Sequence, residues 1–131
     1  MLCLYGADGM AGEEPTPVGE WLVKDQTAHI RIIDCNQKLW GMISWAKDPG
    51  KDEHNPDVAK RNRSVLGIPI LLGMQQWKIN AWQGNIYNAD NGKTYKGSIE
   101  LESDNILQVE GCVWVGILCG GEDWTRIPPR S

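Results

Sequence analysis

Few side chains of this 131-residue chain are spaced for catalysis. His29 alternates with apolar residues beside Arg31, so we expect a histidine on a strand surface and not a general base. Glu122 and Asp123 could act as paired carboxylates, but adjacent residues of a strand point to opposite faces of a sheet. The chain has no Gly-x-Ser-x-Gly or His-Glu-x-x-His motif and no phosphate-binding glycine loop. We therefore predict that the protein has no catalytic residues and is not an enzyme.

The composition argues against several other kinds of site. The four cysteines include no Cys-x-x-Cys pair and there are only two histidines, so no metal site is expected. A net charge of −4 argues against a surface that neutralises nucleic-acid phosphates. No stretch approaches the roughly 18 apolar residues that indicate a membrane-spanning helix. We expect no cofactor, no nucleic-acid partner and no integral membrane segment.

Strands must position any site that the chain has. Ala28, Ile30 and Ile32 alternate with polar residues, which is the pattern of a half-buried strand. Asn91-Gly92 is a strong signal for a tight hairpin turn. Strands are expected at Gly19–Lys24, Thr27–Ile33, Lys38–Trp45, Ile68–Gln76, Ala81–Asn88, Lys93–Leu101, Ile106–Val113 and Glu122–Ile127. Because closure removes exposed edges, consecutive strands in this number predict an all-β fold, an eight-stranded antiparallel up-and-down β-barrel.

Residues 46–67 interrupt the strand pattern. Asn55-Pro56-Asp57 is a favourable helix start, because Asn caps, Pro presets φ and Asp complements the helix dipole. We expect one short helix at about 56–64, between strands three and four. The long connection around it is either a functional lid or a solvated cover over one barrel end.

The beginning of the chain differs from the rest. Met1–Tyr5 is apolar, and Gly9-Met10-Ala11 offers the small residues that a signal peptidase prefers. We expect residues 1–14 to be a signal-peptide remnant or a flexible lead-in, with an expression scar as the alternative. Residues 15–131 are expected to form a single β-barrel domain.

Seven tryptophans, three tyrosines and no phenylalanine form an unusual aromatic set. Such side chains fill cores, and they also line ligand cavities. If the barrel is hollow, we expect the ligand-binding residues to be Trp40, Trp45, Trp82 and Tyr95, which lie on the middle strands. Trp40 and Trp45 have opposite parity, so at most one of them points inward unless a bulge intervenes at Gly41.

Gly19 and Trp21 begin the first expected strand, and Arg126 lies in the last one. A guanidinium over an indole ring gains cation–π and stacking energy and can seal the floor of a barrel. This arrangement resembles the lipocalins, in which a Gly-x-Trp motif opens the first strand and an arginine packs across the tryptophan. The resemblance implies a lipocalin-like barrel, with Arg126 within stacking reach of Trp21.

From Pro17 to Ile127 the chain also resembles a bacterial secreted family known as domain of unknown function 2147. The resemblance is carried by Pro17-Val18-Gly19-Glu20-Trp21, Asn55-Pro56-Asp57, Leu66-Gly67-Ile68-Pro69-Ile70-Leu71, Ile86-Tyr87-Asn88, Asn91-Gly92-Lys93-Thr94-Tyr95, Gly111-Cys112, Cys119-Gly120 and Trp124-Thr125-Arg126-Ile127. It implies export to the periplasm or the outside of the cell and a small β fold. Members of the family often carry a second cysteine just before the glycine of strand three, where this chain has Trp40.

We predict a disulfide between Cys112 and Cys119. The apolar run between them joins the last two strands at a barrel end, and closing this short loop would restrict the unfolded chain. The alternative is a pair of buried free thiols in a cytosolic protein. Cys35 lies in a polar turn without its family partner, and is expected to be a free thiol or to pair with Cys3.

Three classes of function remain. The first is a barrel that binds a small apolar or amphipathic molecule. The second is a solid-cored envelope or protein-interaction module, and the third is an unrecognised enzyme. A cavity lined by aromatic side chains would favour the first class, a packed interior the second, and converging carboxylates or a buried ion pair the third.

Overall fold

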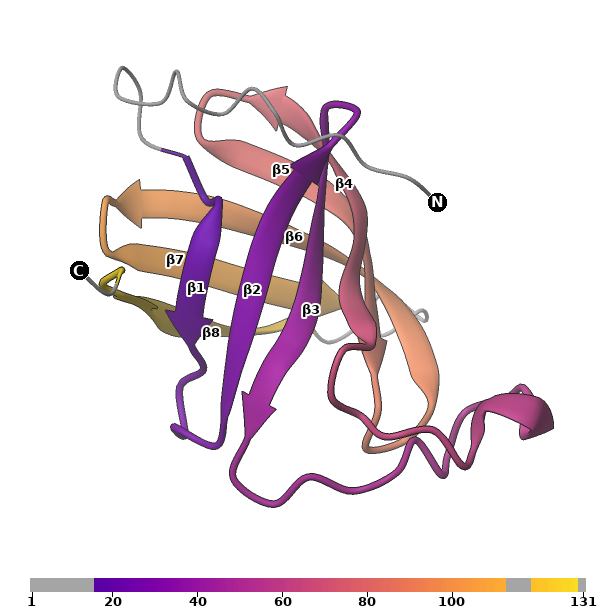
Figure 1. The fold of residues 1–131 in the computed structure, drawn as a ribbon. Helices are drawn as coiled ribbons and strands as arrows, with labels where there is room; N and C mark the ends of the chain where they lie inside the picture. Colours follow the sequence, from indigo (N-terminus) through magenta and orange to yellow (C-terminus); the bar gives the residue numbers. More distant parts are fainter. Residues whose placement is uncertain (1–15, 113–118, 130–131) are drawn as a thin grey trace.

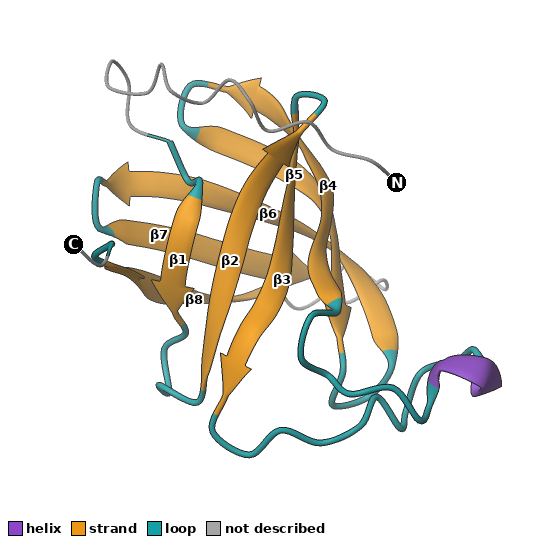
Figure 2. Cartoon of the chain, viewed as in Figure 1, coloured by secondary structure: helices purple, strands orange, loops and turns teal. Residues whose placement is uncertain are grey.

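The structure is a computed structural model, and it describes residues 16–112 and 119–129. It is a closed barrel in which each strand pairs antiparallel with the next and the last pairs with the first (Figures 1 and 2). The strands are β1 (Gly19–Leu22), β2 (Ala28–Cys35), β3 (Lys38–Ala46), β4 (Pro69–Lys78), β5 (Ala81–Asn88), β6 (Lys93–Ser103), β7 (Ile106–Cys112) and β8 (Cys119–Ile127). The predicted eight-stranded up-and-down barrel is confirmed.

The connection between β3 and β4 contains a helix that is shorter than expected. A single 3-10 turn, Val58–Lys60, stands where the sequence predicted a helix at about 56–64. The Asp57 carboxylate caps this turn by accepting from the Ala59 amide, and the Asn55 side chain accepts from the Asp57 amide. The amides of Lys60, Arg61 and Arg63 each donate to the carbonyl oxygen three residues earlier, which is the 3-10 spacing and not the four-residue spacing of an α-helix. The predicted cap therefore makes a turn and does not start an α-helix.

The core fills one half of the barrel. Trp21, Leu71, Ile99 and Leu107 are fully buried there, each from a different strand. These side chains lie on the inward-facing rows because successive residues of a strand alternate between the two faces. The same half contains the turns that join β2 to β3, β4 to β5 and β6 to β7, and we refer to it as the closed end.

The opposite half is referred to as the open end. The β1–β2 turn, the long β3–β4 connection and the β5–β6 turn lie there (Figure 1). No helix among the described residues has the length and apolar character that crossing a membrane would require.

One seam of the barrel is only partly paired. The four-residue strand β1 meets β8 through Thr125, Arg126 and Ile127 alone. β8 continues in the other direction to Cys119 and stays paired with β7 along this length. Residues 120–124 of β8 therefore have a strand neighbour on one side and none in β1 on the other.

Candidate functional site

The floor of the closed end is built around Trp21. Its ring is completely buried, and its Nε1 donates to the Pro17 carbonyl oxygen at 2.8 Å. The Arg126 guanidinium carbon lies 4.4 Å from the centroid of this ring. Arg126 also donates to the carbonyl oxygens of Thr16, Val18 and Asp104 at 2.7, 2.9 and 2.6 Å. Arg126 thus holds the segment that leads into β1 and the β6–β7 turn against the floor of the barrel.

Gly19 is required where it stands in this floor. Its φ of +139° lies in a region that residues with a Cβ rarely adopt, and a Cβ there would lie 2.7 Å from Nη1 of Arg126. The structure therefore brings together the three residues that the sequence assigned to barrel closure.

Toward the open end, a row of glycines crosses four neighbouring strands. Each member stands directly opposite the next in the strand register. We call this set the glycine row: Gly84 on β5, Gly97 on β6, Gly111 on β7 and Gly120 on β8. The inner wall of the barrel therefore lacks side chains along this line.

Only part of the glycine row is filled by neighbouring side chains. A Cβ on Gly84 would meet the Met74 sulfur at 3.0 Å, and one on Gly97 would meet Cδ1 of Ile86 at 2.3 Å. Among the atoms of the described residues, a Cβ on Gly111 would meet only Ile86 within 4 Å, at 3.9 Å, and one on Gly120 would meet none within that distance. The described side chains therefore leave the β7–β8 side of the row less filled than the β5–β6 side.

Inward-facing residues near the glycine row are not fully buried. Ile43 and Ile86 are half-buried although they pack against the core, and Tyr95, which stands opposite Ile86, is half-buried too. In the closed end, Trp21 and Ile99 have no exposed surface. Among the described residues, the inward-facing side chains are therefore more fully buried in the closed end than beside the glycine row.

A buried carboxylate fixes the β3–β4 connection to the outside of β5. Asp52 has no exposed surface, and its carboxylate accepts from the Tyr87 hydroxyl at 2.6 Å and from the Asn55 amide at 2.8 Å. Arg63 adds an ion pair at 3.1 Å. Burial alone would raise the pKa of Asp52, but these hydrogen bonds and the Arg63 charge outweigh it and hold the pKa below its ordinary value.

The alkaline stability of the protein should depend on Tyr87. Burial and the hydrogen bond to the Asp52 carboxylate raise the pKa of Tyr87 from 10.0 to about 12. The unfolded chain would thus release the phenol proton before the folded protein does, so stability present below pH 10 is lost as the pH rises toward 12. Tyr87→Phe should cost about 1–2 kcal/mol at pH 7 and remove this part of the alkaline loss, as measured by urea unfolding across the pH range.

Tyr95→Phe is the matched control for that measurement. The Tyr95 hydroxyl accepts a hydrogen bond from the neutral, exposed Asn91 side chain at 2.8 Å. If the free energy of unfolding changed with alkaline pH in the same way for Tyr87→Phe and Tyr95→Phe, Tyr87 would not be the source of the alkaline loss of stability.

The four aromatic residues predicted to line a cavity do not lie together. Trp40 lies between inward-facing Leu39 and Gly41, so it points outward, and its ring covers the outer side of Gly73 at 3.4 Å from a Cβ placed there. Trp45 is 42% exposed and packs on His29, with ring centroids 4.7 Å apart. A bulge between His29 and Ile30 changes the register, and it leaves Trp45 on the outer face.

The other two predicted residues point inward at different heights. Trp82 stands opposite buried Ile99 and also lines a surface pocket of about 760 Å³ at the closed end. Tyr95 stands opposite Ile86, next to the glycine row. Only Tyr95 is therefore in a position to contact a ligand at the open end.

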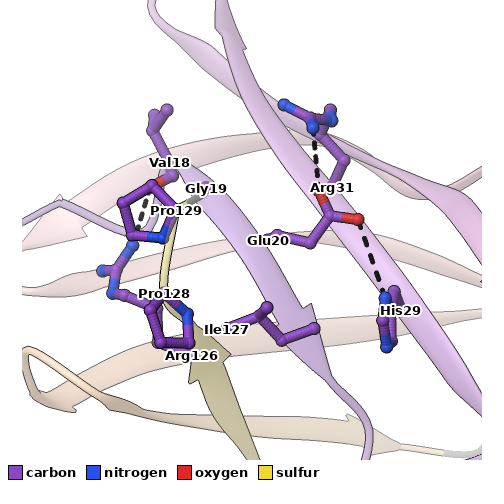
Figure 3. Close-up of a pocket in the computed structure, with 9 residues that line it drawn as sticks. All are labelled: Val18, Gly19, Glu20, His29, Arg31, Arg126, Ile127, Pro128 and Pro129. Atoms are coloured by element: carbon purple, nitrogen blue, oxygen red, sulfur yellow. Dashed lines mark hydrogen bonds and ion pairs between the residues drawn. The ribbon is translucent and has the colours of Figure 1, made fainter. Parts of the chain in front are cut away.

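A second surface pocket, of about 670 Å³, runs along the outer face of β1 (Figure 3). Glu20 on its floor binds Arg31 at 2.8 Å, lies 3.9 Å from Nδ1 of His29 and accepts a hydrogen bond from Ser44. Pro128 and Pro129 form the opposite wall (Figure 3). Because Glu20 is engaged by groups from β2 and β3, this cluster holds the short strand β1 in place.

Cys35 is disulfide-bonded, so the expectation of a free thiol there is wrong. It is only 4% exposed, at the end of β2. The alternative partner named above, Cys3, lies outside the described residues. The backbone of Cys112 stands directly opposite that of Cys119, whereas both side chains lie outside the described part of the chain.

The pairing of Cys112 with Cys119 stays a prediction. Directly opposed residues of antiparallel strands have Cα atoms about 4.5–5.5 Å apart, a separation that a disulfide spans. Peptide mapping without reduction should recover one cross-linked species that contains both residues. A linkage from Cys35 to either of them would contradict it.

Sequence reasoning missed two features of the site. The first is Asp52 with Tyr87, which are 35 positions apart and meet only once β5 and the β3–β4 connection are placed. The second is the glycine row, whose members come from four strands and lie opposite one another only in the register of the barrel. Hairpin register was the available signal, because Asn91-Gly92 fixes the pairing of β5 with β6 and hence Gly84 with Gly97.

Comparisons with known proteins agree with this architecture. A family model described as "Uncharacterized protein conserved in bacteria (DUF2147)" matches residues 19–126. Protein HP1028 from the human pathogen Helicobacter pylori, which belongs to the lipocalin family, superposes with a TM-score of 0.79, at 20% identity over 88% of this chain and 85% of that chain. At this identity the likeness concerns the fold.

A further similarity covers a small part of a much longer protein. The chain is 28% identical over 104 residues to the 1,4-alpha-glucan branching enzyme GlgB of Marinobacter nauticus. The match covers 74% of this chain and spans 14% of the length of that enzyme.

Proposed function

Because this chain belongs to the DUF2147 family of bacterial proteins and has a lipocalin-like barrel, we propose that it binds a small apolar or amphipathic molecule at the open end of the barrel. One observation carries the proposal. The closed end is filled by side chains with little or no exposed surface, whereas at the open end no atom of the described residues lies within 4 Å of a Cβ placed on Gly120. An eight-stranded barrel is just wide enough to hold one small ligand when its interior is not filled by its own side chains.

The proposed role is binding without catalysis. Asp52, Tyr87 and Arg126 have shifted pKa values, but each is engaged in contacts that hold the fold together. Catalytic groups with shifted pKa values are typically found in clefts where a substrate can reach them. Asp52 has no exposed surface and Tyr87 is 9% exposed, which supports a structural role.

A variant with a bulky side chain added at the open end tests the proposal. Gly120→Phe should be tolerated, because a Cβ at this position meets no atom of the described residues within 4 Å, and its ring would occupy the proposed site. We expect the neutral fluorescent probe N-phenyl-1-naphthylamine to bind the unmodified protein and to bind this variant at least about tenfold more weakly. A maltooligosaccharide is titrated in parallel because of the partial similarity to the branching enzyme.

Gly50→Phe is the matched control, since a Cβ there also meets no atom within 4 Å but Gly50 lies in the exposed β3–β4 connection. Equal binding by both variants, or no binding by folded unmodified protein, would show that the open end is not the site.

We also propose that the protein is exported to the periplasm or the medium. The disulfide of Cys35 supports this location, because disulfides persist in oxidising compartments and are rare in the cytosol. Cell fractionation followed by thiol labelling should find the full-length protein outside the cytoplasm, with Cys35 protected until reduction. A cytosolic protein with a reactive Cys35 would contradict the proposal.

A protein-interaction role is the second candidate. Trp77 and Ile79 at the tip of the β4–β5 hairpin are 54% and 81% exposed, and Lys78 lies over the Trp77 ring at 4.9 Å. Large apolar side chains at a turn contribute little to the fold, so a partner surface is the function that would use them. An Ile79→Lys variant separates the two roles. If the hairpin tip binds a partner, this variant should lose the protein that cross-links to the unmodified protein in cells, and it should still bind the ligand.

A further inference from the structure

We infer that the preferred ligand is an amphipathic cation whose positively charged head group binds the carboxylate of Glu122. This inference rests on the proposed function and names the ligand class of the same open end. Glu122 lies on β8 toward the open end, two residues from Gly120 of the glycine row.

Glu122 belongs to the inward-facing row of β8. It has the same parity as Trp124, which is 5% exposed and part of the core, and it stands opposite Val109, which is 7% exposed. Its Oε2 accepts a hydrogen bond from Nε1 of Trp124 at 2.7 Å. The carboxylate is therefore held at a defined place on the inner wall, above the filled half of the barrel.

Glu122 is nevertheless exposed to solvent. The partly paired seam explains this exposure, because β1 joins β8 only at residues 125–127 and leaves residues 120–124 without a partner in β1. A ligand entering the open end can thus reach an inward carboxylate directly.

The described part of the chain supplies no cation for this carboxylate. The ion pairs found there use Glu20 and Asp52 as their acids. A ligand whose apolar part displaces water around Glu122 would leave a carboxylate partly desolvated, which is costly without an opposite charge. A cationic head group removes that cost, a neutral one leaves it, and an anionic one adds repulsion.

The described residues beside the carboxylate offer an apolar wall for the rest of such a ligand. Gly111 and Gly120 place no side chain on the inner wall, and Ile86 and Tyr95 offer half-buried apolar surface beside it. An aromatic ring near a quaternary ammonium adds attraction through its negative face. The site therefore combines an apolar wall with a single carboxylate.

Three decyl probes with different head groups test the inference. Decyltrimethylammonium, 1-decanol and decanoate are titrated below their micellar range, each in competition with N-phenyl-1-naphthylamine. We expect the cation to bind most tightly and decanoate most weakly. Glu122→Gln keeps an acceptor for Trp124 but loses the charge, so it should weaken cation binding about tenfold while 1-decanol binds at least as tightly as before.

Glu110→Gln is the matched control. It removes the same charge from the neighbouring strand, at an exposed position opposite Gly121 on the outer face. An equal loss of cation affinity in both variants, or no loss in Glu122→Gln, would overturn the inference while binding of 1-decanol kept the proposed function intact. Failure of all three probes, including 1-decanol, would overturn both.

Discussion

Replacing Trp21 with alanine should lower the free energy of unfolding by about 3–5 kcal/mol, the range for large aromatic truncations in a core. The ring has no exposed surface, supports the Arg126 guanidinium and donates to the Pro17 carbonyl. Its loss would leave a cavity under Arg126 and remove the donor for that carbonyl. Domains of this size are stable by only about 5–15 kcal/mol, so the variant should be close to unfolded at 37 °C.

Chemical unfolding followed by far-ultraviolet circular dichroism measures this loss without relying on the missing fluorophore. Trp77→Ala is the control, because Trp77 is 54% exposed at a hairpin tip and should change stability by no more than about 0.5 kcal/mol. Comparable losses in the two variants would mean that the floor does not depend on the stacked indole.

A valine at Gly97 should destabilise the barrel by about 3 kcal/mol or more, at the upper end of overpacking costs. A Cβ there would lie 2.3 Å from Cδ1 of Ile86 and 2.7 Å from the carbonyl oxygen of Glu110. Ile86 could adopt another rotamer, but the Glu110 oxygen belongs to the paired strand β7 and cannot move without breaking the ladder. Valine is otherwise favoured in strands, so strand propensity alone predicts that this substitution would stabilise the protein.

Gly120→Val provides the comparison within the same glycine row. Its Cβ would meet no atom within 4 Å in the part of the chain that the structure describes, so strand propensity should dominate and the change in stability should be small or favourable. Thermal or urea unfolding of both variants separates the effects. A stable Gly97→Val protein would show that β6 and β7 can separate at this level, contrary to the structure.

The fold was predictable because its signals are local. Alternation in residues such as Ala28, Ile30 and Ile32 identifies a strand without knowledge of its neighbours. The packing of Arg126 on Trp21 was predictable for another reason. Gly19, Trp21 and Arg126 resemble the residues that close the barrel in lipocalins. The expected helix was wrong in length because the backbone after the Asp57 cap makes hydrogen bonds three residues back and forms only a 3-10 turn.

The site was less predictable because it depends on register. Parity alone could not place Trp45, whose direction is set by a bulge between β2 and β3. The alignment of Gly111 with Gly120 depends on the pairing of β7 with β8, which no turn motif in the sequence fixes. Glu122 was dismissed as half of a carboxylate pair with Asp123, and its inward direction became visible only beside Val109 and Trp124.

The bonds from Arg126 to Thr16 and Val18 have a consequence for the order of folding. They join residues separated by 110 and 108 positions, so the closing pair of strands carries the greatest loop-closure entropy in the barrel. The β1–β8 pairing should therefore form last and exchange its amide hydrogens first. A circular permutant that joins the two ends of the domain and opens within the exposed β3–β4 connection turns this long-range closure into a local hairpin, and it should fold faster than the natural order of strands.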